Sequence, residues 1–316
     1  MRAAGRASSR RFSVGPPDEF GRFEREVNPL RLLKKCVTDP PAAAQSARVA
    51  MRLVSGQFHW LFKPQAPLAY HLPDGGVLLL DQKHSFTGMV WPDTESFEPD
   101  VCGVLRKFLK PGDTFIDGGS NVGYFSVQAG HLVGAQGRVV AIEANPLTFQ
   151  LLERNLKANG FGTPVHCALT SQRGEVELFM PYYWDVVSSL RQDSYVVTDE
   201  MQSFKVEGRT LDEVVEGLAL SKIEMVKIDI EGAELDVLRS APNVLSNFRP
   251  MIVMEYGVKT WGAFGATHEE LLALLDRHRY AVRLFNHRSR ELENIPDDVW
   301  QNAYTNLILI PRERIE

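Results

Sequence analysis

Runs of apolar residues alternate with longer amphipathic segments through the second half of the chain, and this alternation predicts the fold class. Each apolar run is short enough for a strand, and the segment after it repeats its apolar residues with the period of a helix. The predicted strands are TFID (114–117), RVVAIE (138–143), VHCAL (165–169), MVKIDI (225–230) and MIVMEY (251–256). The predicted helices run from about Tyr124, from Pro146 to about Asn159, near Leu211 and from about Ala233. Strands and helices in this order favour a parallel sheet with helices on both faces.

The last part of the chain departs from this pattern. A predicted helix from about His268 is followed by two apolar runs, AVRLF (281–285) and NLILI (306–310), which are separated only by a polar loop (286–298). Two strands with no helix between them are expected to pair antiparallel, because a parallel pair needs a long crossover connection. The predicted sheet therefore ends in an antiparallel pair.

The region before this domain predicts a small β cap. The runs HWLF (59–62), LAYHL (68–72) and VLLLD (77–81) are interpreted as strands, with a hairpin turn at PDGG (73–76). The first 17 residues carry four arginines and no acid, which fits a disordered basic tail or an organelle transit peptide. The predicted organisation is an extension that is partly disordered or helical (1–55), a β cap with a lead-in helix (56–112), and a main domain (113–316) with a β-rich insertion (174–206).

Composition and charge narrow the class of protein. The chain has 316 residues, of which 44% are apolar and 24% are charged, as in ordinary globular domains. The formal net charge of −5 argues against a nucleic-acid partner, and no apolar run is long enough for a membrane span. Cys36, Cys102 and Cys167 are odd in number and show no CxxC spacing, so we expect reduced thiols and a cytoplasmic location.

A glycine-rich turn follows the first strand of the main domain. In DTFIDGGSNVGYFS (113–126), Asp117 ends the strand and is followed by Gly118, Gly119 and Gly123 before the predicted helix. Glycines permit positive φ and let a ligand approach the backbone, and the helix N-terminus attracts an anion. The turn therefore predicts a nucleotide-like ligand, with a purely structural tight turn as the alternative.

An acid at the end of the second strand narrows the choice of ligand. Glu143 lies 20 residues after Gly123, a spacing at which it can hydrogen-bond ribose hydroxyls. A dinucleotide such as NAD and S-adenosylmethionine both fit this arrangement. Asp117 would repel a pyrophosphate but could hold an ammonium group, which favours the aminoacyl end of S-adenosylmethionine. The antiparallel pair at the end of the sheet points the same way, because a dinucleotide fold would continue with a second parallel half.

Taken together, these segments resemble the FkbM-type methyltransferases, a family of class I S-adenosylmethionine-dependent enzymes. The resemblance covers about residues 70–311 and rests on LKPGDTFIDGGSNVGYFS, AIEANP, GEVELF, RTLDEVV, VKIDIEGAELDVL and IVMEYG. It implies an α/β, Rossmann-like class I methyltransferase fold, whose seven-stranded, mostly parallel sheet has the order 3-2-1-4-5-7-6 with the last-placed strand antiparallel. It also implies methyl transfer, usually to a hydroxyl oxygen.

The resemblance assigns residues to a cofactor site. Asp117, Gly119, Asn121 and Gly123 match the family's cofactor loop, Glu143 matches the ribose-binding acid, and Asp229 matches the acid at the tip of the fourth strand. Gly118 and Ser120 replace a β-branched residue and an alanine of the commoner loop, and these small residues should leave the loop functional, with Ser120 in contact with the cofactor. We also expect Ala144 and Ala168 to contact the cofactor.

The insertion supplies candidates for the acceptor side. Ser188 and Ser189 resemble an SSL element that recurs in the family and are expected to bind substrate or face the cofactor pocket, with an ordinary turn as the alternative. Tyr182, Tyr183 and Trp184 form an aromatic group that would suit a sugar or ring-shaped acceptor, or would form a hydrophobic lid.

The stretch VKIDIEGAELDVL (226–238) carries four acids at the end of a buried strand. We expect Asp229 to orient the acceptor or accept its proton, with hydrogen bonding to the cofactor or to loop amides as the alternative. Glu231 is a second catalytic candidate, although a carboxylate in a first helical turn is also stabilised by the helix dipole. Glu234 is expected to belong to the same capping turn, and Asp236 to face solvent.

Three other residues are weaker candidates. Glu255 ends the next strand and is expected to bind substrate or cap a helix; with Asp229 it could bind Mg²⁺, but the sequence shows no dense acid cluster, so we expect no metal site. His268 and His287 are candidate general bases because histidine is the residue type suited to proton transfer near neutral pH, but both are expected to be surface or capping residues.

The sequence therefore predicts an S-adenosylmethionine-dependent enzyme that methylates a hydroxyl of a sugar, polyketide-like or other small-molecule or glycan acceptor. The alternatives are an NAD-dependent oxidoreductase and a non-catalytic scaffold of the same fold. The oligomeric state is left open.

Overall fold

A computed structural model describes residues 51–52, 54–56, 58–63, 65–82, 84–90, 97–181, 187–194, 201–302 and 304–315. The chain divides into two compact units, Met1–Ser55 and Gly56–Glu316, and nearly all described residues belong to the second unit. The predictions for residues 1–50 and for the aromatic group 182–184 lie outside the described residues.

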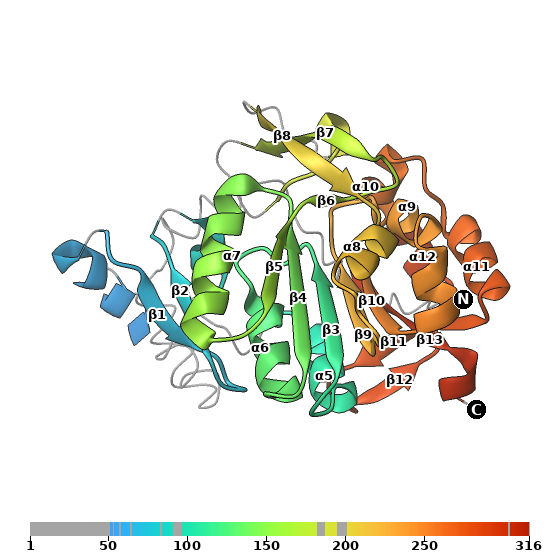
Figure 1. Ribbon diagram of the computed structural model, residues 1–316, viewed down its shortest axis with the longest axis horizontal. Coiled ribbons are helices and arrows are strands. Elements are labelled where there is room, and N and C mark those ends of the chain that lie inside the picture. Colours follow the sequence, from blue (N-terminus) through green and yellow to red (C-terminus); the bar gives the residue numbers. More distant parts are fainter. Residues whose placement is uncertain are drawn as a thin grey trace, which may run out of the picture. The chain divides into compact units, whose positions relative to one another are not determined.

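A mixed sheet of eight strands forms the centre of the second unit (Figure 1). Its order is β12-β11-β13-β10-β9-β3-β4-β5. The strands are β3 (Thr114–Gly118), β4 (Arg138–Glu143), β5 (Thr163–His166), β9 (Met225–Ile228), β10 (Met251–Gly257), β11 (Tyr280–Asn286), β12 (Glu291–Glu293) and β13 (Tyr304–Pro311). The predicted order 3-2-1-4-5-7-6 is confirmed, and one strand more than predicted, β12, extends the edge next to β11.

The antiparallel end of the sheet agrees with the prediction. β13 pairs antiparallel with both β10 and β11, whereas β3, β4, β5, β9 and β10 run parallel. The prediction of a plain polar loop between the last two strands was wrong, because β12 lies within it and pairs with residues Leu284–Asn286 of β11. Only three residues form this strand, and a run of alternating acids around one leucine carries almost no strand signal.

Helices cover both faces of the sheet because its strand residues point alternately to each side. On one face lie α5 (Pro99–Phe108), α6 (Tyr124–Val133) and α7 (Pro146–Asn159), packed on side chains such as Phe115, Val139 and Val253. On the other face lie α8 (Leu211–Gly217), α9 (Glu234–Arg239) and α11 (His268–Arg277), packed on Ile116, Val226 and Ile252. The sheet is thus buried on both faces, as parallel sheets usually are.

The β-rich insertion forms a separate three-stranded sheet in the order β6-β8-β7, with β6 (Ala168–Leu169), β7 (Gly174–Pro181) and β8 (Met201–Arg209). The prediction of one strand over 165–169 was wrong, because His166 ends β5 while Ala168 and Leu169 leave the main sheet to pair with β8. Figure 1 shows this small sheet beyond the carboxyl end of β5.

The cap is a hairpin and not a three-stranded unit. β1 (Leu68–His71) and β2 (Val77–Leu80) pair antiparallel around the predicted turn, which is confirmed. The prediction of a strand at HWLF was wrong, because Phe58–Phe62 are helical; a short apolar run alone cannot distinguish the two states. The free edge of β2 is held by α7, since the amides of Val77 and Leu79 donate to the side chains of Asn159 (2.9 Å) and Asn155 (2.7 Å).

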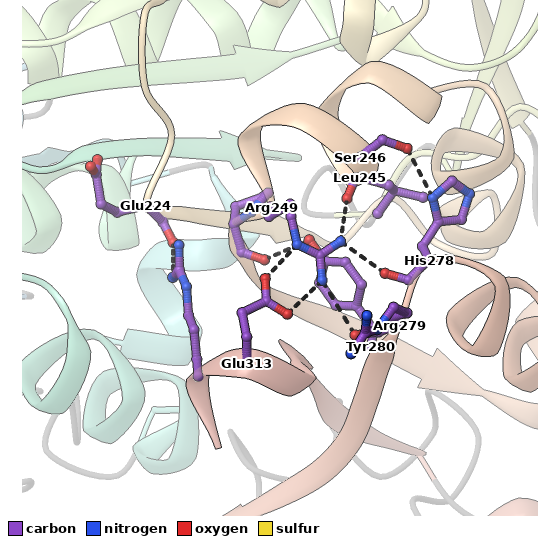
Figure 2. A network of polar contacts seen from close by, with 10 residues as sticks. Glu224, Leu245, Ser246, Arg249, His278, Arg279, Tyr280 and Glu313 are labelled. Atoms are coloured by element: carbon purple, nitrogen blue, oxygen red, sulfur yellow. Dashed lines mark hydrogen bonds and ion pairs between the residues drawn. The ribbon is translucent and has the colours of Figure 1, made fainter. Parts of the chain in front are cut away.

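A polar network fixes the opposite end of the sheet, at the amino end of β10 (Figure 2). The Arg249 guanidinium donates to the carbonyls of Leu245 (3.3 Å) and His278 (2.9 Å) and pairs with Glu313 (2.8 Å) in the 3₁₀ turn Arg312–Arg314. The Tyr280 ring packs on the guanidinium at 5.2 Å. The partners of Arg249 lie next to the ends of β10, β11 and β13. The network therefore stabilises the antiparallel pairing of β13 with β10 and β11.

Among the helices of the described part of the chain, none combines the length and the apolar character required to span a membrane.

Candidate active site

Four acids lie at or just after the carboxyl ends of four parallel strands. Asp117 is on β3, Glu143 ends β4, Asp229 follows β9 and Glu255 is near the end of β10. Open α/β sheets bind ligands outside the carboxyl ends of their strands. This edge is therefore the candidate site.

The glycine turn after β3 is pressed against the chain that leaves β9. The Asp229 amide donates to the Gly118 carbonyl (3.0 Å), and a Cβ added to Gly119 would lie 1.8 Å from the Asp229 carbonyl oxygen. Gly119 also has φ of 77°, so both space and backbone conformation require glycine there. The amides of Gly119 and Ser120 both donate to the Ile142 carbonyl at the end of β4 (3.0 and 2.9 Å). The turn is thus fixed between β4 and β9.

Glu143 joins the glycine turn to the start of α7. Its carboxylate accepts the amides of Asn121 (2.9 Å) and Asn145 (2.8 Å), and Asn121 adopts the left-handed conformation with φ of 50°. Burial raises the pKa of Glu143 to about 7. A carboxylate offers about four acceptor sites, so two backbone bonds leave capacity for the hydroxyls of a ligand.

Asp117 is more deeply buried than expected for a side chain that contacts a ligand at the protein surface. Its side chain is fully buried, and Oδ2 accepts a hydrogen bond from the Ser126 hydroxyl of α6 (2.6 Å). Its Oδ1 is buried without a hydrogen-bond partner in the described part of the chain, and burial raises its pKa. An unpaired buried oxygen is costly unless a ligand or water bonds to it.

Lys227 is a site residue that the sequence analysis missed. Its side chain is only 2% exposed, and Nζ donates to Asp229 Oδ2 (2.8 Å) and lies 4.9 Å from the centre of the Phe125 ring. Burial alone would lower its pKa, but the carboxylates of Asp229, Asp117 and Glu98 outweigh burial and raise it. A lysine inside the apolar run MVKI was the available signal.

Glu98 was also missed, and no sequence signal pointed to it. It precedes α5 in the left-handed conformation, with φ of 39°, and backbone strain of this kind often marks functional sites. The residue is partly exposed, yet its Oε2 is buried and has no hydrogen-bond partner among the residues described. Burial, followed by repulsion from Asp229, raises its pKa to about 8.

Three carboxylates converge where β9 and β10 end. One oxygen each of Asp229, Glu231 and Glu255 lies within 4.8 Å of the others. Glu231 adopts the left-handed conformation with φ of 61°, and Glu255 is 8% exposed. The sequence showed no dense acid cluster because Glu255 comes from the neighbouring strand and only the sheet brings it level with Asp229.

The two remaining acids of this stretch hold the backbone. Glu234 is fully buried, and its carboxylate accepts the amides of Ile230 (3.0 Å) and Gly232 (3.1 Å), so it shapes the turn that carries Glu231. The prediction that Asp236 faces solvent was wrong. It is half-buried and accepts the Ser171 amide (2.9 Å), which ties α9 to the turn before β7.

The predicted serines connect the insertion with the edge of the main sheet. Ser188 Oγ accepts from the Asn145 side chain (3.2 Å), and Ser189 Oγ donates to the Glu231 carbonyl (3.2 Å). Ser189 is buried and bridges to Phe179 on β7. These contacts place the segment between the loops that follow β4 and β9.

The four remaining sequence candidates are two alanines near the insertion and two histidines near the C-terminal strands. Ala168 is buried in β6, and the Ala144 carbonyl bonds to the ring of His166 (3.1 Å). His268 stacks on Trp300 with a centroid distance of 5.0 Å, and His287 is exposed after β11.

Comparison with known proteins gives the family. The model of the methyltransferase FkbM domain family matches residues 117–282, which is more than half of the chain and runs from β3 to β11. The protein therefore belongs to the methyltransferase FkbM domain family.

Two curated relatives share part of this region. The hexuronic acid methyltransferase AglP of Haloferax volcanii is 30% identical over 157 residues, which cover 49% of this chain and 61% of that protein. Methyltransferase 1 of Beauveria bassiana is 28% identical over 160 residues, which cover 44% of this chain and 62% of that protein. The chain thus spans less than two thirds of the length of either relative.

Solved structures show only a distant likeness. A putative rRNA methylase from Clostridium thermocellum has a TM-score of 0.40 and 11% identity, over 66% of this chain and 90% of that one. An S-adenosylmethionine-dependent O-methyltransferase from Thermotoga maritima has a TM-score of 0.36 and 14% identity, over 79% of this chain and 80% of that one. At these scores the likeness says nothing about the ligand of this chain.

Replacing Gly119 by alanine tests the packing of the glycine turn. Gly160 is the matched control, because it has a similar φ of 73° but no atom within 4 Å of an added Cβ. We expect Gly160→Ala to lower the free energy of unfolding by about 1–2 kcal/mol through backbone strain. Gly119→Ala should lower it by roughly 1–3 kcal/mol more, because its Cβ meets backbone. Equal losses in urea unfolding would contradict the described contact.

The pH dependence of stability tests the environment of Glu98. Because its folded pKa of about 8 exceeds the ordinary value of 4.5, the folded state binds the proton more tightly. The wild type should therefore lose stability relative to Glu98→Gln as pH rises from about 5 to about 8, by on the order of 3 kcal/mol. Thermal unfolding of both proteins across this range measures the difference. A pH-independent difference would show that the Glu98 carboxyl is not desolvated.

Proposed function

We propose that the protein is an S-adenosylmethionine-dependent methyltransferase that methylates a hydroxyl oxygen of a sugar or another small molecule. One arrangement carries this proposal. The glycine turn after β3 is bonded to Glu143 at the end of β4 and contacts Asp229 after β9, which supports a nucleoside site at the turn with an acidic group for an acceptor beside it. Membership of the methyltransferase FkbM domain family supports it.

The described residues fit the cofactor. Glu143 retains acceptor capacity for ribose hydroxyls. Asp117 Oδ1 has no hydrogen-bond partner among the described residues, which supports a positive group bound there, directly or through water. Gly119, Ser120, Asn121 and Gly123 would bring their backbone to it, and Ala144, Ala168 and Ser188 would border its base. Bound S-adenosylmethionine would supply a methyl group on a sulfonium sulfur, whose transfer to a hydroxyl releases one proton and leaves a neutral thioether.

Asp229 is the proposed group that orients the acceptor and takes this proton. Its Oδ2 is bonded to Lys227, which fixes the carboxylate, and its side chain is 20% exposed, so the other oxygen can reach an acceptor. Orientation and proton acceptance are what a transfer from an activated donor needs from the protein. Glu231 is a second candidate for the same role, and Glu255 and Ser189 would border the acceptor.

The charge of the site favours methylation of a hydroxyl over a carboxylate. The relative from Haloferax volcanii is named a hexuronic acid methyltransferase, which supports a sugar acceptor for this chain. Asp229, Glu231 and Glu255 would repel an acceptor carboxylate at the point of transfer. An O-methyl ether, and not a methyl ester, is therefore the proposed product even for a uronic acid.

A radiolabel transfer assay tests this function. Purified protein is incubated with methyl-labelled S-adenosylmethionine and with glycosides that end in a neutral hexose, a hexuronic acid or a polyketide-like polyol. We expect base-stable methyl ethers on at least one sugar. Asp229→Asn should lower kcat by about 10²–10⁴-fold, the range of general acid–base catalysis, while S-adenosylhomocysteine binding is retained.

The control is Asp297→Asn, since Asp297 is exposed in the loop after β12. It should behave as the wild type. Full activity of Asp229→Asn would remove the proposed role of Asp229. Base-labile methyl esters would contradict the hydroxyl acceptor, and reduction of NAD without methyl transfer would favour the oxidoreductase.

A further inference from the structure

We propose that Asp229, Glu231 and Glu255 bind a hard divalent cation, Mg²⁺ or Mn²⁺, at the carboxyl ends of β9 and β10. The binding site stands on these three side chains alone. Its role in catalysis, which would be to hold an acceptor hydroxyl, rests on the methyl transfer proposed above.

The three carboxylates are brought together by separate constraints. The Asp229 amide is bonded to Gly118, and the turn at Glu231 is held because Glu234 accepts the amide of Gly232 (3.1 Å). Glu255 lies in β10, opposite Asn306 of β13. One oxygen from each acid lies within 4.8 Å of the others, a spacing that oxygen ligands around one metal ion can adopt. The backbone thus holds three like charges together before any ligand binds.

Glu255 gives the second and independent observation. The residue is 8% exposed, and its Oε2 is buried with no hydrogen-bond partner in the described ranges. A buried carboxylate oxygen needs a hydrogen-bond donor or a cation, because its isolation from water is costly. The Glu255 side chain has a hydrogen bond to Tyr304, and a metal ion among the three acids would add a cation beside the same carboxyl group.

Lys227, the nearby buried cation, donates its hydrogen bond to Asp229 and not to the Glu255 carboxylate. Lys227 donates to Asp229 Oδ2 and faces the Phe125 ring. Its charge also interacts with the carboxylates of Asp117 and Glu98. The neighbourhood therefore holds more negative than positive charge. Hard cations prefer carboxylate oxygens, and Mg²⁺ keeps several ligand positions for water or substrate. Three carboxylates leave such positions open.

Titration with MnCl₂ tests the site, with bound Mn²⁺ counted from the loss of the free-ion electron paramagnetic resonance signal at pH 8. The wild type should bind one Mn²⁺ per chain, and MgCl₂ should displace it. Glu255→Gln and Glu231→Gln should each weaken binding at least about tenfold, because each removes a charged ligand. Glu153→Gln is the matched control, since Glu153 is exposed on α7. It should bind Mn²⁺ as the wild type does.

No saturable binding, or binding that survives both Glu255→Gln and Glu231→Gln, would overturn the proposal. If no Mn²⁺ binds saturably, a proton shared among the three acids, and not a metal ion, would neutralise their charge. Circular dichroism of the variants checks folding, and the half-exposed Glu231 keeps the test valid if Glu255→Gln fails to fold.

Titration with S-adenosylhomocysteine in EDTA separates this proposal from the function on which its role rests. We expect wild type, Glu255→Gln and Glu231→Gln to bind it with affinities within about threefold of each other, because the nucleoside site lies at β3 and β4. Binding of S-adenosylhomocysteine without any binding of Mn²⁺ would remove the metal site and leave the methyltransferase. Binding of Mn²⁺ alone would leave the metal site and remove the methyltransferase.

Discussion

The buried ion pair between Lys227 and Asp229 is the interaction on which the site depends. Lys227 is almost fully enclosed beneath Phe125, and an ammonium in such a place must be paired. The pairing fixes the Asp229 side chain just after the carboxyl end of β9. The backbone of Asp229 in turn leaves room only for a glycine at position 119, so the same residue carries the acidic group and positions the glycine turn.

The carboxyl ends of the neighbouring parallel strands and the loops beside them carry several acids that are largely removed from water. Asp117, Glu143, Glu234, Glu255 and Glu98 all have raised pKa values, and burial is the largest cause for each. Glu143 and Glu234 are stabilised by backbone amides and serve to shape turns, whereas Asp117, Glu98 and Glu255 each keep an oxygen without a hydrogen-bond partner in the residues described. Buried acids with perturbed pKa values often mark functional sites, and these oxygens mark where positive charge or hydrogen-bond donors would enter.

The local parts of this account could be predicted from the sequence and the non-local parts could not. The succession of strands and helices follows from apolar periodicity, and the glycine turn and Glu143 follow from a motif whose residues are near each other in the chain. The strand order and the place of Asp229 came from the resemblance to the FkbM-type methyltransferases. HWLF and β12 were mispredicted because short runs do not separate helix, strand and loop. The position of Glu255 beside Asp229 was expected from the strand order. The left-handed turn that brings Glu231 to both of them, and the left-handed turn that carries Glu98 before α5, were not. Lys227 was visible as a charge in an apolar strand but gave no hint of its partner.

Calorimetric titration of the wild-type protein with S-adenosylhomocysteine and, separately, with NAD tests the central claim most directly, because both ligands could use a glycine turn and an acid at the end of β4. The account predicts saturable binding of one S-adenosylhomocysteine per chain and no binding of NAD. Binding of NAD alone would contradict it and favour an oxidoreductase. Binding of neither ligand would leave a fold without the proposed cofactor.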